Sequence, residues 1–179
     1  MTLGVHTKTT LKMEVRFAEM KMLLEGEWRG EGMAKFPTIE DTQYTEVCIF
    51  TPDEDKDSIH FDQKTIYKNN TEKNGKTVFW DTGFILLKEN KVLWVSAQVG
   101  GRTETYTMEN YLGGETTKII FNSTHIDNDL KTIRSQRILN ISKSELNYEL
   151  NMSTLQAPEF QNHLFASLKR KSNTKSYVL

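Results

Sequence analysis

Histidine and cysteine are the residues of this chain best suited to ligate a metal or activate a substrate, and both are scarce. The 179 residues include four histidines and one cysteine: His6, His60, His125, His163 and Cys48. No two histidines have the spacing of a zinc motif such as His-Glu-x-x-His, and one cysteine can form neither an intramolecular disulfide nor a thiolate zinc site. The sequence also lacks a phosphate-binding glycine loop and a serine nucleophile elbow. It therefore offers single imidazoles and no multi-residue catalytic motif.

The four histidines differ in their surroundings. His6 lies in a lead segment that we expect to be unstructured, and His60 and His125 lie in alternating stretches where we expect surface positions. His163 lies in the largely apolar segment Phe160–Ala166. From the residues alone, a lone histidine in such a segment is most simply a buried structural residue.

Composition and charge restrict the class of protein. Hydrophobic residues make up 37% of the chain, and even with the 10 glycines added it stays at the low end of the roughly 45–50% usual for globular proteins. The net charge of −1 provides no long-range attraction for nucleic acid or an anionic membrane. No apolar run reaches the length of a signal peptide or of a membrane span, about 18 residues. We expect a cytoplasmic, single-domain protein without nucleic-acid or membrane partners.

A hydrophobic period of two dominates the chain after Gly26. Before it, the apolar spacing over residues 11–24 predicts one short helix or turn. Ten stretches then alternate as half-buried strands do: Trp28–Met33, Tyr44–Phe50, Ser58–Tyr67, Thr77–Leu87, Val92–Gln98, Arg102–Tyr111, Thr116–His125, Ile133–Ile141, Leu146–Met152 and His163–Lys169. Polar turns such as Lys73–Lys76, with its Asn-Gly pair, and Lys88–Lys91 predict tight hairpins.

Ten short strands joined by hairpins predict an all-β fold. We expect an antiparallel up-and-down β-barrel of about ten strands with a short N-terminal helix or turn. A β-sandwich is the alternative, but it would need longer crossovers. A barrel of this size is wider than its own side chains can fill, so a ligand cavity is expected inside. The expected organisation is a lead and short helix over residues 1–21, the barrel over 22–171 and a polar tail over 172–179.

Short sequence tags recur in a fixed order along almost the whole barrel. They are Leu24–Gly32, Phe36–Ile39, Tyr44–Glu46, Gln63–Thr65, Asp81–Phe84, Val95–Gln98, Met152–Thr154 and Asn162–Leu164. Together they resemble the nitrobindins, a family of haem-binding β-barrels shaped like fatty-acid-binding proteins. The resemblance implies one haem b per chain, held in a wide pocket at the barrel mouth.

The same resemblance implies which residues bind the haem. His163 matches the proximal ligand of the haem iron, Gln98 and Met152 match pocket-lining positions, and Thr38 lies near the mouth. For Gln98 and Met152, simple core packing is an equal alternative, since methionine fills irregular cavities readily. Phe79 stands where the family usually has a pocket histidine.

Phe79 is one of three departures from the family pattern. Asp81 replaces a longer glutamate, and Leu86 stands where an arginine is common. The loss of a polar pocket residue implies a drier site with one hydrogen-bond donor fewer, and it leaves open whether haem is held as in typical members. The sequence also leaves open whether Phe79 or Trp80 faces the cavity, because a one-residue bulge would exchange the two.

Three functions follow as hypotheses. The resemblance implies a protein that binds nitric oxide and isomerises peroxynitrite to nitrate at a His-ligated ferric haem, as a monomer or homodimer. The alternative is a non-catalytic carrier of a lipid or another apolar small molecule. A third is a haem-free module whose C-terminal Tyr177–Leu179 segment enters a groove on a partner protein.

Overall fold

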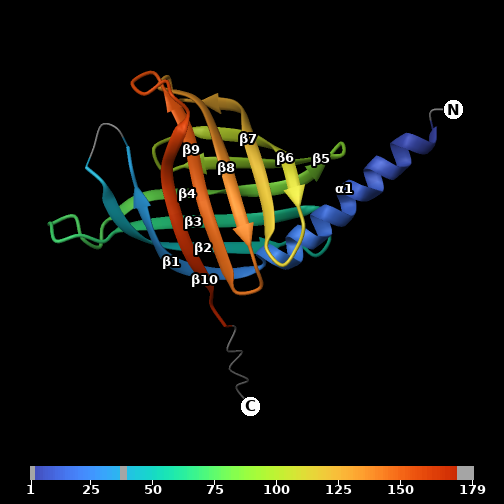
Figure 1. Cartoon of the computed structure of the whole chain (residues 1–179), viewed down its shortest axis with the longest axis horizontal. Helices are drawn as coiled ribbons and strands as arrows, with labels where there is room; N and C mark the ends of the chain where they lie inside the picture. The colour runs from blue at the N-terminus through green and yellow to red at the C-terminus, as the bar shows by residue number, and fades with distance from the viewer. Residues whose placement is uncertain (1–2, 37–39, 173–179) are drawn as a thin grey trace, which may run out of the picture.

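A computed structural model shows one helix followed by a closed antiparallel β-barrel (Figure 1). The structure describes residues 3–36 and 40–172. The elements in chain order are α1 (Leu3–Leu24), β1 (Gly26–Ala34), β2 (Thr42–Pro52), β3 (Ser58–Tyr67), β4 (Thr77–Lys88), β5 (Lys91–Gln98), β6 (Thr103–Leu112), β7 (Thr117–Asp127), β8 (Thr132–Ile141), β9 (Glu145–Thr154) and β10 (Gln161–Arg170). Each strand pairs with its neighbour in the chain, and β1 also pairs with β10. The predicted up-and-down barrel is confirmed.

One of the two predicted tight hairpins is present in the structure, and the other is replaced by a longer connection. Between β4 and β5 the chain turns at Glu89 and Asn90, whose positive φ angles of 50° and 62° are those of a two-residue type I′ turn. The connection from β3 to β4 is longer than the tight hairpin expected from its Asn-Gly pair. It spans residues 68–76 and contains its own turn, in which Gly75 has a φ of 79°.

The closure of the barrel depends on Gly30. This residue pairs with Leu168 across the seam between β1 and β10. A Cβ atom at Gly30 would lie 1.9 Å from the carbonyl oxygen of Ser167. Only a glycine therefore lets the first and last strands approach closely enough to pair.

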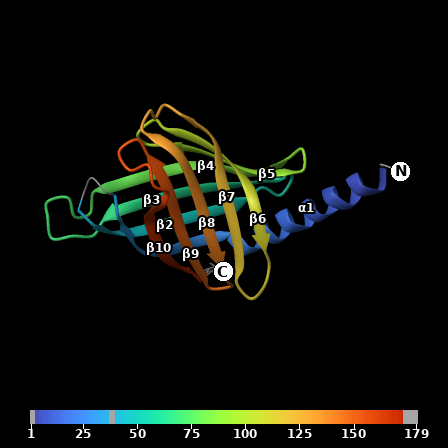
Figure 2. The ribbon, with the colours of Figure 1, turned by 45° about the horizontal axis from the view of Figure 1, so that its top comes forward.

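The helix α1 is longer than predicted and packs on one end of the barrel. It begins at Leu3 rather than near Leu11, so it includes the segment around His6 that was expected to be unstructured. Its first turns extend beyond the barrel in both views (Figures 1 and 2). Its C-terminal half is held by three buried side chains, Phe17, Met20 and Leu24.

Arg170 fixes the end of this helix. Its Nη2 donates a hydrogen bond to the carbonyl of Leu23 at 2.6 Å, and its guanidinium lies 4.1 Å from the ring centre of Trp28. Of the three basic residues Lys169–Lys171 at the end of β10, Arg170 thus packs against the protein rather than extending into solvent. Trp28 and Trp94 are both buried in the core. Among the described residues, no helix has the length and hydropathy needed to cross a membrane.

Candidate functional site

A cavity of about 340 Å³ lies at the end of the barrel opposite α1. Its walls come from the ends of β1, β3, β5 and β9 and from the starts of β2, β4 and β10. The lining residues include Ala34, Phe36, Tyr44, Thr65, Val78, Phe79, Gln98, Arg102, Asn128, Asp129, Leu150, Met152 and Leu164. Three residues predicted for the site, Phe79, Gln98 and Met152, therefore lie together. Of the other two predicted residues, Thr38 lies outside the described residues, and His163 lies beside the cavity.

A bulge at the start of β4 decides which aromatic side chain enters the cavity. Thr65 pairs with Phe79, but the next residue of β3, Ile66, pairs with Thr77, which leaves Val78 as the extra residue. Val78 and Phe79 both line the cavity as a result. Trp80 points outward: it is 42% exposed, and its Nε1 donates a hydrogen bond to Asp62 Oδ2 at 2.9 Å.

A second bulge, in β10, buries His163. Asn162 pairs with Asn151 and Leu164 with Leu150, so His163 is the unpaired residue between them. Its side chain is 1% exposed, and neither ring nitrogen has a hydrogen-bond partner among the residues that the structure describes. Burial lowers the pKa of this imidazole, which favours the neutral form with a free lone pair. His163 is thus a buried imidazole whose two ring nitrogens have no hydrogen-bond partner among the described residues.

His163 lies directly beside the cavity rather than in its wall. The ring of Phe36 packs edge-on against the imidazole with 5.1 Å between ring centres. Phe36 and Leu164, the next residue along the chain, both line the cavity. An unpaired ring nitrogen next to an apolar cavity is what a haem iron needs as a ligand, so the residues present fit that group.

Polar side chains in the cavity wall already have partners within the protein. Arg102 Nε donates to Gln98 Oε1, and Gln98 Nε2 donates to Glu104 Oε2, both at 2.8 Å. The hydroxyl of Tyr44 donates to the carbonyl of Phe165 at 3.3 Å. The cavity therefore presents a mainly apolar surface, in agreement with the dry pocket that Phe79 implies.

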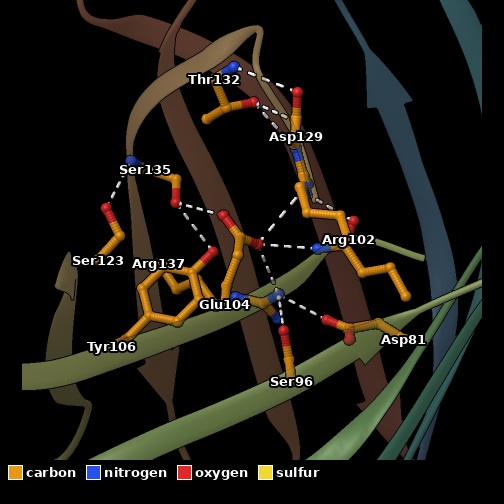
Figure 3. Close-up of polar contacts among 11 residues, drawn as sticks. Asp81, Ser96, Arg102, Glu104, Tyr106, Ser123, Asp129, Thr132, Ser135 and Arg137 are labelled. Carbon is orange, nitrogen blue, oxygen red and sulfur yellow. Dashed lines mark hydrogen bonds and ion pairs between the residues drawn. The ribbon is translucent and has the colours of Figure 1, made fainter. Parts of the chain in front are cut away.

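Below the cavity, a buried charged network crosses the interior of the barrel (Figure 3). Arg137 of β8 contacts Asp81 of β4 at 2.5 Å and Glu104 of β6 at 3.8 Å. Its guanidinium carbon also lies over two aromatic rings, 4.7 Å from the centre of Trp94 and 4.9 Å from that of Tyr106. Burial raises the pKa of Asp81 even though Arg137 opposes that rise.

The network continues to the cavity through Glu104. This carboxylate accepts hydrogen bonds from Ser135 Oγ at 2.7 Å and from Gln98 at 2.8 Å. Arg102 bonds in turn to Asp129 at 3.1 Å. The orientation of the Gln98 amide at the cavity wall is thus set by charges in the core.

Sequence reasoning did not find this network, although a signal was present. Glu104 lies two residues before the buried Tyr106 in β6, so both side chains face the interior. Arg137 likewise lies two residues before the buried Leu139 in β8. A charge at an inward position predicts a buried partner, because an unpaired buried charge is unstable. Asp81 was noted only as a shortened family residue. Leu86, the other departure, pairs with Ser58 at the helix end of the barrel, away from the cavity.

Glu46 is a third buried carboxyl, after Asp81 and Glu104, and its protonation can be tested by varying the pH. Burial raises its pKa, opposed by hydrogen bonds from Cys48 and from Gln63 Nε2 at 2.7 Å. A raised folded-state pKa means that protonated Glu46 contributes to the free energy of unfolding. This contribution is fully present below the ordinary glutamate pKa of 4.5 and is lost as the pH rises through the higher pKa of the folded state. We expect Glu46→Gln to be more stable than wild type at pH 7, by about 1 kcal/mol.

Urea unfolding from pH 4 to pH 8 measures this difference. The advantage of Glu46→Gln should shrink toward pH 4, where Glu46 is protonated in both folded and unfolded chains. Glu115→Gln, in an exposed turn, is the control and should differ little from wild type at any pH. A variant that is less stable than wild type at pH 7 would show that Glu46 is needed as a carboxylate.

The remaining histidines lie away from this site. His60 and His125 are exposed, as predicted. No group of three or more histidine, cysteine or acidic side chains that could hold a metal ion occurs in the described part of the chain. His163 is thus the histidine that the fold places beside the cavity.

Comparison with known proteins assigns the family. The family model described as a THAP4-like, heme-binding beta-barrel domain matches residues 18–170 of the chain. The chain belongs to this family. The nitrobindin resemblance of the sequence tags is thereby confirmed.

Two relatives named as peroxynitrite isomerases match over most of their length. Peroxynitrite isomerase 2 of Mycobacterium ulcerans (strain Agy99) is 30% identical over 156 residues, which cover 83% of this chain and 91% of the relative. Peroxynitrite isomerase 1 of Rhodococcus jostii (strain RHA1) is 29% identical over 147 residues, with coverage of 81% and 79%. The crystal structure of Rv2717c from M. tuberculosis superposes with a TM-score of 0.76 at 25% identity and covers 87% of this chain and 98% of that one.

Proposed function

We propose that this chain binds one haem b through His163, binds nitric oxide and isomerises peroxynitrite to nitrate. The family to which the chain belongs and its similarity to two peroxynitrite isomerases support this proposal. The observation that carries it is the state of His163, a neutral and buried imidazole without a hydrogen-bond partner among the described residues, beside an apolar cavity.

The chemistry divides between the cofactor and the chain. A bound ferric haem would supply a Lewis-acidic iron that polarises the substrate oxygen. His163 supplies the proximal ligand, and its lowered pKa keeps the lone pair free of a proton near neutral pH. Phe79, Val78 and Met152 give the cavity an apolar lining, and Gln98 is held in one orientation by Glu104 and Arg102.

Peroxynitrite decay tests the activity directly. Stopped-flow mixing with the haem-loaded protein at neutral pH should accelerate decay over buffer, with nitrate as the product. The apoprotein and an equal amount of free ferric haem are the controls. Decay no faster than with free haem would remove the isomerase proposal and leave a haem-binding protein.

One observation favours a second function, that of a carrier for an apolar small molecule. The cavity wall is mainly apolar, and Tyr44, Gln98 and Arg102 all have partners within the protein. Mass spectrometry of organic extracts of the purified protein would identify such a ligand. A stoichiometric lipid that haem does not displace would favour the carrier, whereas an empty extract would count against it.

Substitutions on the two faces of β4 should affect haem affinity differently. Phe79→Ala removes apolar surface that would contact the haem, so we expect the haem dissociation constant to rise about tenfold. Phe84→Ala, on the same strand but 48% exposed, is the matched control and should leave the constant unchanged. Equal affinities for both variants, measured by titration with ferric haem, would place the haem elsewhere.

A further inference from the structure

The helix α1 has a second apolar face, which nothing in the described chain covers. Leu11, Val15 and Met22 are 62%, 50% and 70% exposed, and Ala18 between them is exposed as well. These four residues follow one another at intervals of four, three and four. We call them the α1 stripe. The opposite face of the helix, with Phe17 and Met20, is the one buried against the barrel.

The spacing of the α1 stripe is that of the a and d positions of a coiled coil. Such a seam is apolar because it packs against a second helix. The N-terminal part of α1 also extends past the barrel (Figures 1 and 2). A second helix can therefore approach the outer side of α1, where the stripe lies. A partner helix therefore has both a seam and access to it.

Charged residues flank the stripe in a pattern that selects the partner. Lys12 and Glu19 lie on one edge, each directly after a stripe residue, and Glu14 and Lys21 lie on the other edge, each directly before one. Each edge thus carries one positive and one negative charge. Flanking charges of this kind set the partner and the orientation of paired helices.

We propose that α1 pairs antiparallel with α1 of a second copy of this chain. A two-fold axis across the seam brings each edge against the same edge of the partner. Lys12 then lies near Glu19 of the partner subunit, and Glu14 lies near Lys21 of the partner subunit. Every contact occurs twice, as a two-fold interface requires.

Parallel pairing is disfavoured by the same charges. A parallel arrangement brings opposite edges together and places Glu14 near Glu19 of the partner subunit, which is repulsive. Glu19 and Lys21 also contact the barrel. The Tyr111 hydroxyl donates to Glu19 Oε2 at 2.9 Å, and Lys21 Nζ donates to the carbonyls of Asp53 at 2.9 Å and Lys56 at 2.5 Å. Each keeps capacity for a partner, since a carboxylate has a second oxygen and an ammonium has a third hydrogen.

Sedimentation equilibrium of the full-length apoprotein tests the proposal. A seam of four residues per helix predicts a weak dimer that forms at micromolar concentrations or above and dissociates on dilution. Val15→Lys, in the middle of the stripe, should yield a monomer, and Phe84→Lys, on the exposed face of β4, should not change the dimer. Circular dichroism verifies that both variants fold. A wild-type chain that stays monomeric at the highest soluble concentration would overturn the proposal.

Two further variants test the orientation. Lys12→Glu should weaken the dimer about fivefold, and Lys12→Glu with Glu19→Lys should restore it. In a Cys48→Ser background, a mixture of Leu11→Cys and Met22→Cys chains should form the mixed disulfide on oxidation. Disulfides joining two Leu11→Cys chains, or two Met22→Cys chains, would instead show parallel pairing and overturn the antiparallel model.

Discussion

Replacing His163 with leucine is expected to abolish haem binding and, at the same time, to make the apoprotein more stable. The wild-type imidazole is 1% exposed, and neither nitrogen finds a partner in the described part of the chain. Burying an unsatisfied polar group typically costs about 1–3 kcal/mol, and a leucine of similar size avoids this penalty. The opposite signs of the two effects distinguish a ligand from a structural histidine.

Two measurements on one variant test this prediction. Titration with ferric haem should give the Soret band of a protein-bound haem for wild type and only the spectrum of free haem for His163→Leu. Urea unfolding without haem should show a free energy of unfolding about 1 kcal/mol higher for the variant. His60→Leu and His125→Leu, at exposed positions, should match wild type in haem binding. Haem binding by His163→Leu that equals wild type would exclude His163 as the ligand.

Arg137→Met is expected to lower the free energy of unfolding by about 3–5 kcal/mol at neutral pH. The substitution leaves Asp81 and Glu104 buried without the positive charge that both contact in the wild type. A buried carboxylate that has lost its partner then takes up a proton or unfolds the chain. The loss should therefore be smaller at low pH, where Asp81 is protonated in both the folded and the unfolded chain.

Matched variants distinguish the effect of breaking the buried network from the effect of removing any arginine. Arg134→Met, on the same strand but exposed and stacked on Phe160 at 4.3 Å, should cost less than about 1 kcal/mol. The double variant Asp81→Asn with Arg137→Met should lose less than the sum of its single variants, because the two residues share one interaction. Strict additivity would show that the ion pair between Asp81 and Arg137 contributes nothing.

The strand order was predictable because it follows from local information. In an up-and-down barrel each strand pairs with its neighbour in the chain, so alternation together with short connections defines the topology. The start of α1 was not predictable in the same way. The segment before Leu11 shows no apolar periodicity, and its helix continues from the turns that pack on the barrel.

The residues of the site were predictable only by type. The family tags pointed to His163, Phe79, Gln98 and Met152, and the structure places the last three in one cavity with His163 beside it. The contacts of Gln98 were not predicted, although its partners Arg102 and Glu104 are close in the sequence, because they reach its amide only where β6 folds back beside β5.

The sequence by itself determined the barrel, its ten strands and the family, because period-two alternation and ordered tags are properties of the chain alone. The tertiary structure decided which side chains face the cavity and which charges meet in the core. The bulges beside Val78 and at His163 each shift a strand by one residue, and a shift of one residue exchanges its inner and outer faces. The contacts of Arg137 with Asp81 and Glu104 form only when the closed barrel brings β4, β6 and β8 around one interior.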